Sequence, residues 1–222
     1  KENVKGADGE EQIKYCKVLS FNYTNTYERL YLDKQQIQNS IDYIHGKAKL
    51  FNTVENNNMV LGIDEYLTDE RKDRETEFIA FKKFYQRIYK ETGCKYKDWV
   101  ETIREEYDDF LQEKERIINR ANEYVGNDVQ RMMHRLQASA VRDQKCKMHN
   151  VYIFGHSLDI TDKDILRELI LNENVYTTIF YLNRDVMGQQ IANLVKIIGQ
   201  DELIRRTGGK SKTIEFKQQK EC

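Results

Sequence analysis

Short apolar segments alternate with helical patterns near both ends of the chain. The first, residues 18–21, is continuous and ends in the polar segment 22–26, after which Glu28, Leu30 and Tyr31 begin a helix. Later segments of strand character are residues 41–44, 59–63, 151–154, 177–182 and 213–216. Continuous apolar runs are typical of strands buried on both faces. The sequence therefore predicts an α/β fold with a mostly parallel, Rossmann-like sheet.

The middle of the chain changes to a helical period. Apolar residues recur every three or four positions, from Phe78 to Ile88, from Val100 to Tyr124 and from Val129 to Ala140. Gly93 is a predicted C-cap, and residues 126–128 supply a stop and a new N-cap. We therefore expect a helical insertion at 73–145 that packs on itself, between a first core part at 1–72 and a second at 146–222.

Composition and charge narrow the function classes. The 222 residues include 36 Lys and Arg against 37 Asp and Glu, so the net charge of -1 offers no basic field for nucleic acid. The four cysteines lie far apart, and we find neither a signal peptide nor a long apolar run. These observations favour a cytoplasmic protein without a membrane segment. Arg205, Arg206, Lys210 and Lys212 are interpreted as part of a solvated loop.

Polar residues follow three of the predicted strands. They are Asn22, then His45 with Gly46, then the loop 155–159, after which Thr161 and Asp164 predict a capping box. The carboxyl ends of parallel strands form the edge where ligands bind. Each residue also has a structural explanation, because such side chains commonly satisfy turns and loops.

Two other kinds of site fit the sequence poorly. A nucleophile elbow around Ser157 would need glycine two positions later, where Asp159 stands. Cys146 and His149 form a lone pair with no third or fourth metal ligand nearby in sequence, so we expect no metal. The aromatic residues of the helical insertion are interpreted as packing, or as a surface for a partner or a second copy.

The ordered motifs resemble a known family. Residues 19–28 carry Asn22, Thr24 and Glu28, residues 43–46 carry His45, residues 61–64 carry Asp64, and residues 155–162 carry Ser157 and Asp159. In this order they are similar to the AbiH family of phage abortive-infection proteins. The resemblance implies a bacterial antiviral defence protein. In that family a Gly-rich turn precedes this region, so we expect that an N-terminal segment is missing from a chain that begins at Lys1.

The same order resembles, more remotely, sirtuin-type domains that consume NAD. This resemblance implies that Asn22 positions water or ribose and that His45 acts as the base, which makes both catalytic candidates. It also implies that Thr24, Gly155, Ser157 and Asp159 bind the cofactor, with NAD as substrate or ligand. Thr24 departs from the pattern, because the sirtuin motif has an acid there.

Two functions remain open at this stage. The first is an abortive-infection protein with a sirtuin-like nucleotide site that hydrolyses NAD in a longer parent protein. The alternative is a non-catalytic binding module that senses a nucleotide or a phage component. In either case the helical insertion is a candidate surface for a phage trigger or for homo-oligomer formation.

Overall fold

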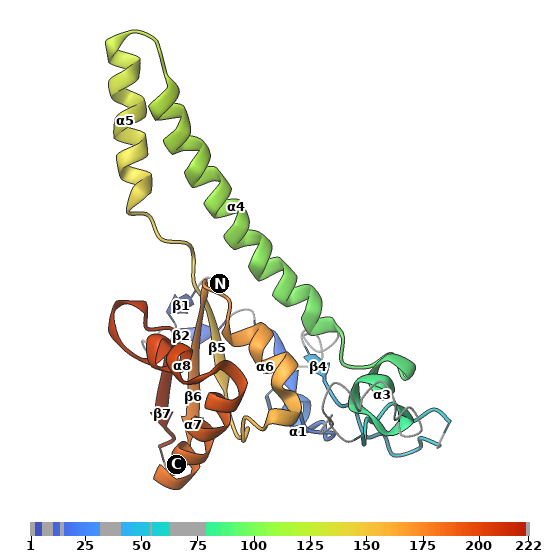
Figure 1. Ribbon diagram of the computed structural model, residues 1–222. Coiled ribbons are helices and arrows are strands. Elements are labelled where there is room, and N and C mark those ends of the chain that lie inside the picture. Colours follow the sequence, from blue (N-terminus) through green and yellow to red (C-terminus); the bar gives the residue numbers. More distant parts are fainter. Residues whose placement is uncertain are drawn as a thin grey trace. The chain divides into compact units, whose positions relative to one another are not determined.

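The computed structural model describes residues 3–5, 11–13, 16–31, 41–53, 55–62 and 79–220 (Figure 1). The chain divides into two compact units, Lys1–Asp98 and Trp99–Cys222, which are described separately below. Helices and parallel strands occur in both units, so the α/β class is confirmed. Within the described ranges, none of the helices is both long and apolar enough to cross a membrane.

The first unit contains two small sheets. Strands β1 (Asn3–Lys5) and β2 (Glu11–Ile13) pair antiparallel, and β3 (Val18–Ser20) pairs with β4 (Ile41–Tyr43) in parallel. Helix α1 (Thr26–Tyr31) begins where the sequence predicted it, since the Arg29 N–H donates to the Asn25 carbonyl at 3.1 Å. The η1 turn (Ile79–Phe81) and α3 (Lys83–Tyr89) follow later in this unit.

The strand predicted at residues 59–63 is wrong for its described part, residues 59–62. The Val60 N–H donates to the His45 carbonyl at 2.8 Å, but the backbone on either side pairs with side chains. Gln86 Oε1 accepts from the Leu61 N–H, and Lys90 Nζ donates to the Met59 carbonyl. These contacts replace a strand ladder. Ile63 and Asp64 lie outside the described residues.

The predicted role of Gly93 as a C-cap is also wrong. Helix α3 ends at Tyr89 with Lys90 as its cap, several residues before this glycine. Gly93 has φ +68, and a Cβ there would clash with the Ile44 carbonyl. Close backbone approach therefore explains the glycine. The predicted start of this helical region, residues 75–78, lies outside the described residues.

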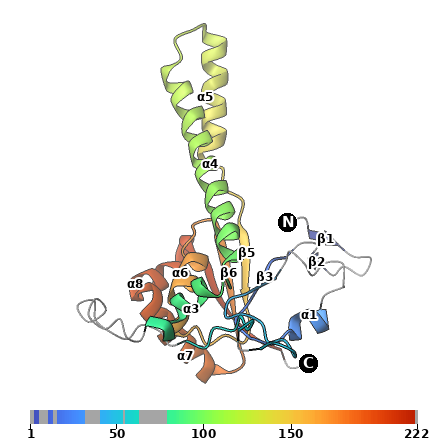
Figure 2. The same cartoon turned by 90° about the vertical axis from the view of Figure 1, so that its right-hand side faces the viewer.

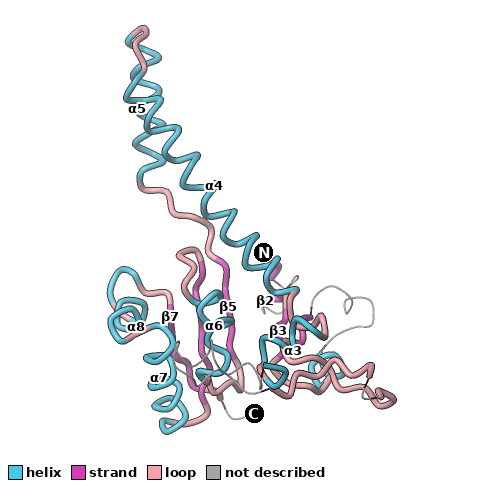
Figure 3. The backbone as a smooth tube through the Cα atoms, turned by 45° about the vertical axis from the view of Figure 1, so that its right-hand side comes forward, coloured by secondary structure: helices cyan, strands magenta, loops and turns pink. Residues whose placement is uncertain are grey.

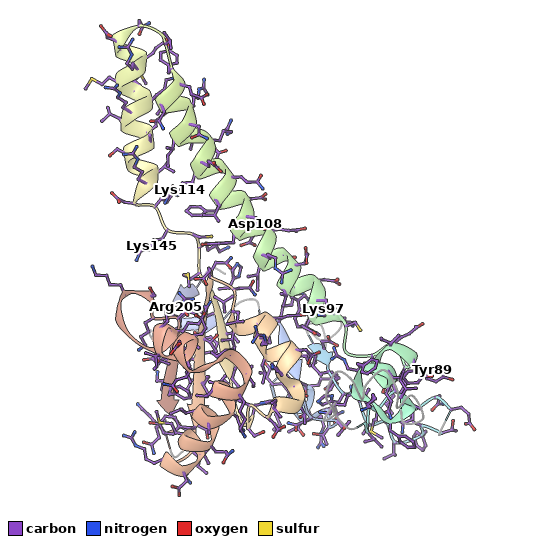
Figure 4. The ribbon with its side chains drawn as sticks, viewed as in Figure 1. Tyr89, Lys97, Asp108, Lys114, Lys145 and Arg205 are labelled. Atoms are coloured by element: carbon purple, nitrogen blue, oxygen red, sulfur yellow. The ribbon has the colours of Figure 1, made fainter. Side chains whose placement is uncertain are left out.

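In the second unit the helices predicted within residues 100–140 are present, but the apolar residues of the second helix, which were expected to pack within the insertion, are exposed. Helix α4 (Lys95–Glu123), whose first turn belongs to the first unit, lies antiparallel to α5 (Asp128–Arg142) (Figure 2). The Asn127 side chain accepts from the Gln130 N–H at 2.9 Å, which confirms the predicted N-cap. Lys114, which interrupts the apolar seam of α4, donates to the carbonyl of Arg142 at 2.6 Å (Figure 4).

The rest of the second unit is a parallel sheet with helices packed on one face. Strands β5 (His149–Ile153), β6 (Val175–Tyr181) and β7 (Ile214–Gln218) lie in that order (Figure 3). The helices are α6 (Lys163–Ile170), α7 (Arg184–Ile198) and α8 (Gln200–Thr207), preceded or followed by the short turns η2 (Ile160–Asp162) and η3 (Gly209–Ser211). Their core includes Leu166, Ile179, Leu194 and Ile214.

The predicted single Rossmann-like sheet stays a prediction. The described strands form parallel sheets of two and three strands, one in each unit, and an antiparallel pair. The predicted division at 1–72, 73–145 and 146–222 likewise stays a prediction. Helices α3, α4 and α5 all lie within the range expected for the insertion.

Arg206 is a buried hub of the second unit, which corrects its interpretation as part of a solvated loop. It is 1% exposed. Each of its five N–H groups has an acceptor. The acceptors are a carboxylate oxygen each of Glu202 and Glu173, the carbonyls of Leu171 and Asn172, and the Thr213 hydroxyl. One guanidinium thus joins α8 to the segment before β6 and to the start of β7.

We expect Arg206→Ala to destabilise the second unit by on the order of 3–5 kcal/mol, because buried carbonyls and carboxylates lose their donor. Arg205→Ala is the matched control, since Arg205 contacts the same two glutamates from an exposed position, and it should cost under about 1 kcal/mol. Urea unfolding followed by circular dichroism measures both. Equal midpoints for the two variants would contradict the hub.

Acid should weaken the same cluster. Hydrogen bonds from Arg205 and then Arg206 lower the pKa of Glu202 from 4.5 to about 2. A lowered folded-state pKa stabilises the protein above the unfolded value and loses this effect as pH falls. Between pH 4.5 and about 2 the wild type should therefore lose more unfolding free energy than Glu202→Gln. Parallel stability curves over this range would argue against the shift.

Candidate site at the carboxyl ends of the parallel strands

In the first unit, the pairing of β3 with β4 places Asn22 and His45 at equivalent positions. The register aligns Ser20 with Tyr43, and the Ile44 N–H donates to the Ser20 carbonyl at 2.9 Å. Asn22 stands two residues after Ser20, and His45 stands two residues after Tyr43. The structure therefore brings these two predicted residues to the same end of neighbouring strands, while their catalytic roles stay predictions.

His45 is 7% exposed and packs among aromatic rings. The centroid of its ring lies 5.9 Å from that of Phe21 and 6.2 Å from that of Tyr23. Gly46 has φ +79, and a Cβ there would clash with the Asn58 carbonyl. The glycine after the histidine is thus required by backbone geometry. The imidazole lies against the residues on both sides of Asn22.

Asn22 and Thr24 sit in the turn that follows β3. Ser20 Oγ accepts from the Asn22 N–H at 3.3 Å and lies 3.1 Å from the Asn22 carbonyl, so the turn is fixed through backbone atoms. The Asn22 residue itself is exposed. Thr24 Oγ1 lies 3.0 Å from the hydroxyl of Thr26, the first residue of α1. The Thr24 hydroxyl is therefore already engaged with a side chain of α1.

A charged cluster beside this turn was not predicted. Glu28 accepts from the Tyr43 hydroxyl at 3.0 Å and from Lys47 Nζ at 2.5 Å. Burial and the Glu28 carboxylate raise the pKa of Tyr43. Buried Asp42 accepts from the Tyr96 N–H at 2.9 Å, in the first turn of α4. Burial raises the pKa of Asp42, and the Tyr96 hydrogen bond opposes that shift. The only signal of this cluster in the sequence was the position of Tyr43 and Lys47, two residues before and after His45.

In the second unit, the loop 155–159 follows the carboxyl end of β5. Gly155 has φ +62 and Leu158, which is fully buried, has φ +57. Ser157 is exposed. Asp159 Oδ1 accepts from the Thr161 N–H at 3.0 Å and caps η2. The predicted capping box from Thr161 to Asp164 is therefore wrong, because α6 begins at Lys163 without a side-chain cap.

His156 fixes the shape of this loop. Its Nδ1 accepts from the Leu158 N–H at 2.8 Å, so the proton of the neutral ring lies on Nε2. Nε2 is 3.5 Å from Oδ2 of the buried Asp162. Both ring nitrogens are thus engaged within the loop. This pattern favours a structural role for His156.

Two side-chain amides of α7 donate hydrogen bonds to backbone carbonyls of the loop 155–159. Gln190 Nε2 donates to the carbonyls of His156 at 3.0 Å and Phe180 at 3.3 Å. Asn193 Nδ2 donates to the Ser157 carbonyl at 2.9 Å. Both side chains are buried. Sequence reasoning missed them because a polar residue on the inner face of a helix gives no signal of its distant partner.

Among the residues that the structure describes, no group of three or more His, Cys, Asp or Glu side chains is placed to hold a metal ion. His149 Nε2 lies 2.8 Å from Glu106 Oε2 of α4. Burial raises the pKa of the Cys146 thiol. The contact between His149 and Glu106 links the helical hairpin of α4 and α5 to β5.

The predicted site residues thus fall into two groups. Asn22, Thr24 and His45 belong to the first unit, and Gly155, Ser157 and Asp159 belong to the second. Within each unit they follow the carboxyl end of a parallel strand. A common cavity for the two groups stays a prediction.

We expect Gln190→Ala and Asn193→Ala to loosen the loop 155–159. Each removes a buried donor to a backbone carbonyl, at a cost on the order of 1–3 kcal/mol. Amide hydrogen exchange over residues 155–160 should accelerate in both variants. The control is Lys196→Ala, because Lys196 is an exposed residue of the same helix. Unchanged exchange in the first two variants would show that the loop holds itself.

Comparison with known proteins agrees with the motif order. A family model described as "Bacteriophage abortive infection AbiH" matches residues 2–182, a range that includes every predicted site residue. Neither a search of curated proteins nor a search of solved structures found a match. Since the family model covers most of the sequence, the chain belongs to the AbiH family of bacteriophage abortive-infection proteins.

Proposed function

We propose that this chain acts in abortive phage infection through a nucleotide site at the carboxyl ends of its parallel strands. The observation that carries the proposal is the parallel pairing of β3 and β4, because Asn22 and His45 each stand two residues after the last aligned pair, Ser20 and Tyr43. Ligands of parallel α/β sheets bind at this edge. Family membership supplies the biological role, and the strand ends supply the candidate site.

NAD is the nucleotide that we propose, as a substrate. The Asn22 amide would orient a water molecule towards the ribose carbon, and His45 would accept the proton of that water. The bond from ribose to nicotinamide breaks with its electron pair passing to the ring nitrogen of nicotinamide. Water thus becomes the new hydroxyl of ADP-ribose. A histidine suits this step because its ordinary pKa lies near neutrality.

The loop 155–159 is a separate candidate for binding a phosphate group, within the second unit. Apart from the two neighbouring residues of the chain, no heavy atom of the described residues lies within 4 Å of the place of a Cβ at Gly155, so the space beside its backbone is open there. The exposed Ser157 can donate a hydrogen bond to a phosphate oxygen. Asp159 is bound to the Thr161 N–H, and Thr24 is bound to Thr26, so these two are the weaker members of the proposed ligand set.

The alternative is a binding module that senses a nucleotide or a phage component without catalysis. Two observations favour it. His45 is buried against Phe21 and Tyr23, which restricts the approach of a water molecule to its ring. In addition, Thr24 offers no carboxylate to help stabilise a ribosyl cation.

The two functions differ in their response to substitution. In the protein as cells make it, Asn22→Ala and His45→Gln should each lower nicotinamide release from NAD by about 100-fold or more if the site is catalytic. Phage protection should fall in parallel. Asn22→Ala is the more informative variant, because the residue is exposed and its turn is fixed through backbone atoms.

His134→Ala serves as the matched control, since this histidine lies on α5 with its ring centroid 4.7 Å from that of Tyr124. It should leave NAD turnover unchanged. If the wild type releases no nicotinamide yet binds NAD and protects cells, the sensing module replaces the enzyme. Absence of both turnover and binding would end the proposal of a NAD site.

A further inference from the structure

Helix α5 carries an apolar stripe on the side that faces away from its hairpin partner. Val129, Met132, Met133 and Leu136 are between 56% and 71% exposed, and Ala140 is exposed as well. Their spacing of three, four and seven residues places them on one face of the helix. An apolar face of this kind normally lies against another element.

The opposite face of α5 already packs against α4. Ala138 is buried, and Arg131, His134 and Val141 are half-buried. At about 100° per residue these four positions lie roughly 160° around the helix from the apolar stripe. The hairpin therefore uses the more polar face of α5 for its internal contact and leaves the more apolar face exposed.

We propose that the stripe of α5 (Val129, Met132, Met133, Leu136 and Ala140) is a homodimer interface, in which α5 packs antiparallel against α5 of a second copy. One edge of the stripe carries Asp128, Arg135 and Arg142, seven residues apart. A twofold arrangement places Asp128 at the N-terminus of one helix beside the partner's Arg142 at the C-terminus of the other. The opposite charges and the opposed helix dipoles both favour this direction.

The apolar residues agree with the same register. When Asp128 lies beside the partner's Arg142, Met132 lies opposite the partner's Leu136 at the centre of the contact. Arg135 then lies near the twofold axis, where its long side chain can extend its charge into water. A parallel pairing would instead place Asp128 and Arg135 beside the partner's apolar Met133 and Ala140, and this ion pair would not form. Charge complementarity therefore identifies a second copy as the occupant, in the antiparallel sense.

The size of the stripe sets the expected strength. One helix per chain buries under about 1,200 Å² in total, at the low end of specific interfaces. The dimer should therefore be reversible, with a Kd on the order of micromolar. Methionine side chains adapt readily to a facing surface, which suits an interface that forms and dissociates.

The experiment is sedimentation velocity of the full chain over a concentration series up to about 200 µM. The wild type should shift from monomer to dimer. Leu136→Glu, which places a charge at the centre of the stripe, should raise the Kd by about 10-fold or more. Gln137→Glu is the matched control, because it adds the same charge one residue away from the stripe, and its Kd should stay within about 2-fold of wild type.

Charge reversal tests the orientation. Asp128→Lys and Arg142→Glu should each weaken the dimer, and the two changes together should restore it, because the pair forms again with exchanged signs. Circular dichroism should show unchanged helix content in every variant. A chain that stays monomeric throughout the series would overturn the proposal and leave the stripe to another protein. A dimer that Leu136→Glu leaves intact, or that Gln137→Glu disrupts equally, would overturn it too.

Discussion

The parallel pairing of neighbouring strands is the constraint on which the candidate site depends. Parallel strands start and end together, so whatever follows one strand lies beside whatever follows the next. In the first unit this rule aligns the turn after β3 with the turn after β4, and hence Asn22 with His45. In the second unit it brings the loop after β5 to the same edge as the start of α7. Strand register therefore determines which turns lie side by side at each edge of a sheet.

Strand ends alone do not shape the loops, and distant side chains complete them. The loop 155–159 takes its form from a positive φ at Leu158, from His156 and from two amides of α7. A leucine in the left-handed region is unfavourable, and burial of its side chain in the core offsets that cost. Leu158 therefore belongs both to the core of the second unit and to the loop of its candidate site. A change in α7 should reach the loop through hydrogen bonds without touching any ligand.

The sequence was most informative where local chemistry decides the structure. Apolar runs located β3, β4, β5 and β6, and Asn127 marked the start of α5 through a contact three residues away. Prediction failed where a distant partner decides. Residues 59–62 looked like a strand, but Gln86 and Lys90 take up their backbone groups. Arg206 was interpreted as solvated because two of its acceptors, Leu171 and Glu173, lie more than thirty residues away in sequence.

The candidate site residues differ in whether the fold binds them through backbone atoms or through their side chains. At Asn22 and Ser157 the fold uses main-chain atoms, through Ser20 and Asn193 respectively, and both residues are exposed. At Asp159 the side chain caps a helical turn, and at Thr24 the side chain contacts the Thr26 hydroxyl. A ligand group competing for Thr24 or Asp159 would have to replace an existing hydrogen bond, whereas Asn22 and Ser157 can meet a ligand without that loss. In the proposed function, Asn22 is therefore the stronger candidate ligand-binding residue of the first unit, and Ser157 that of the second.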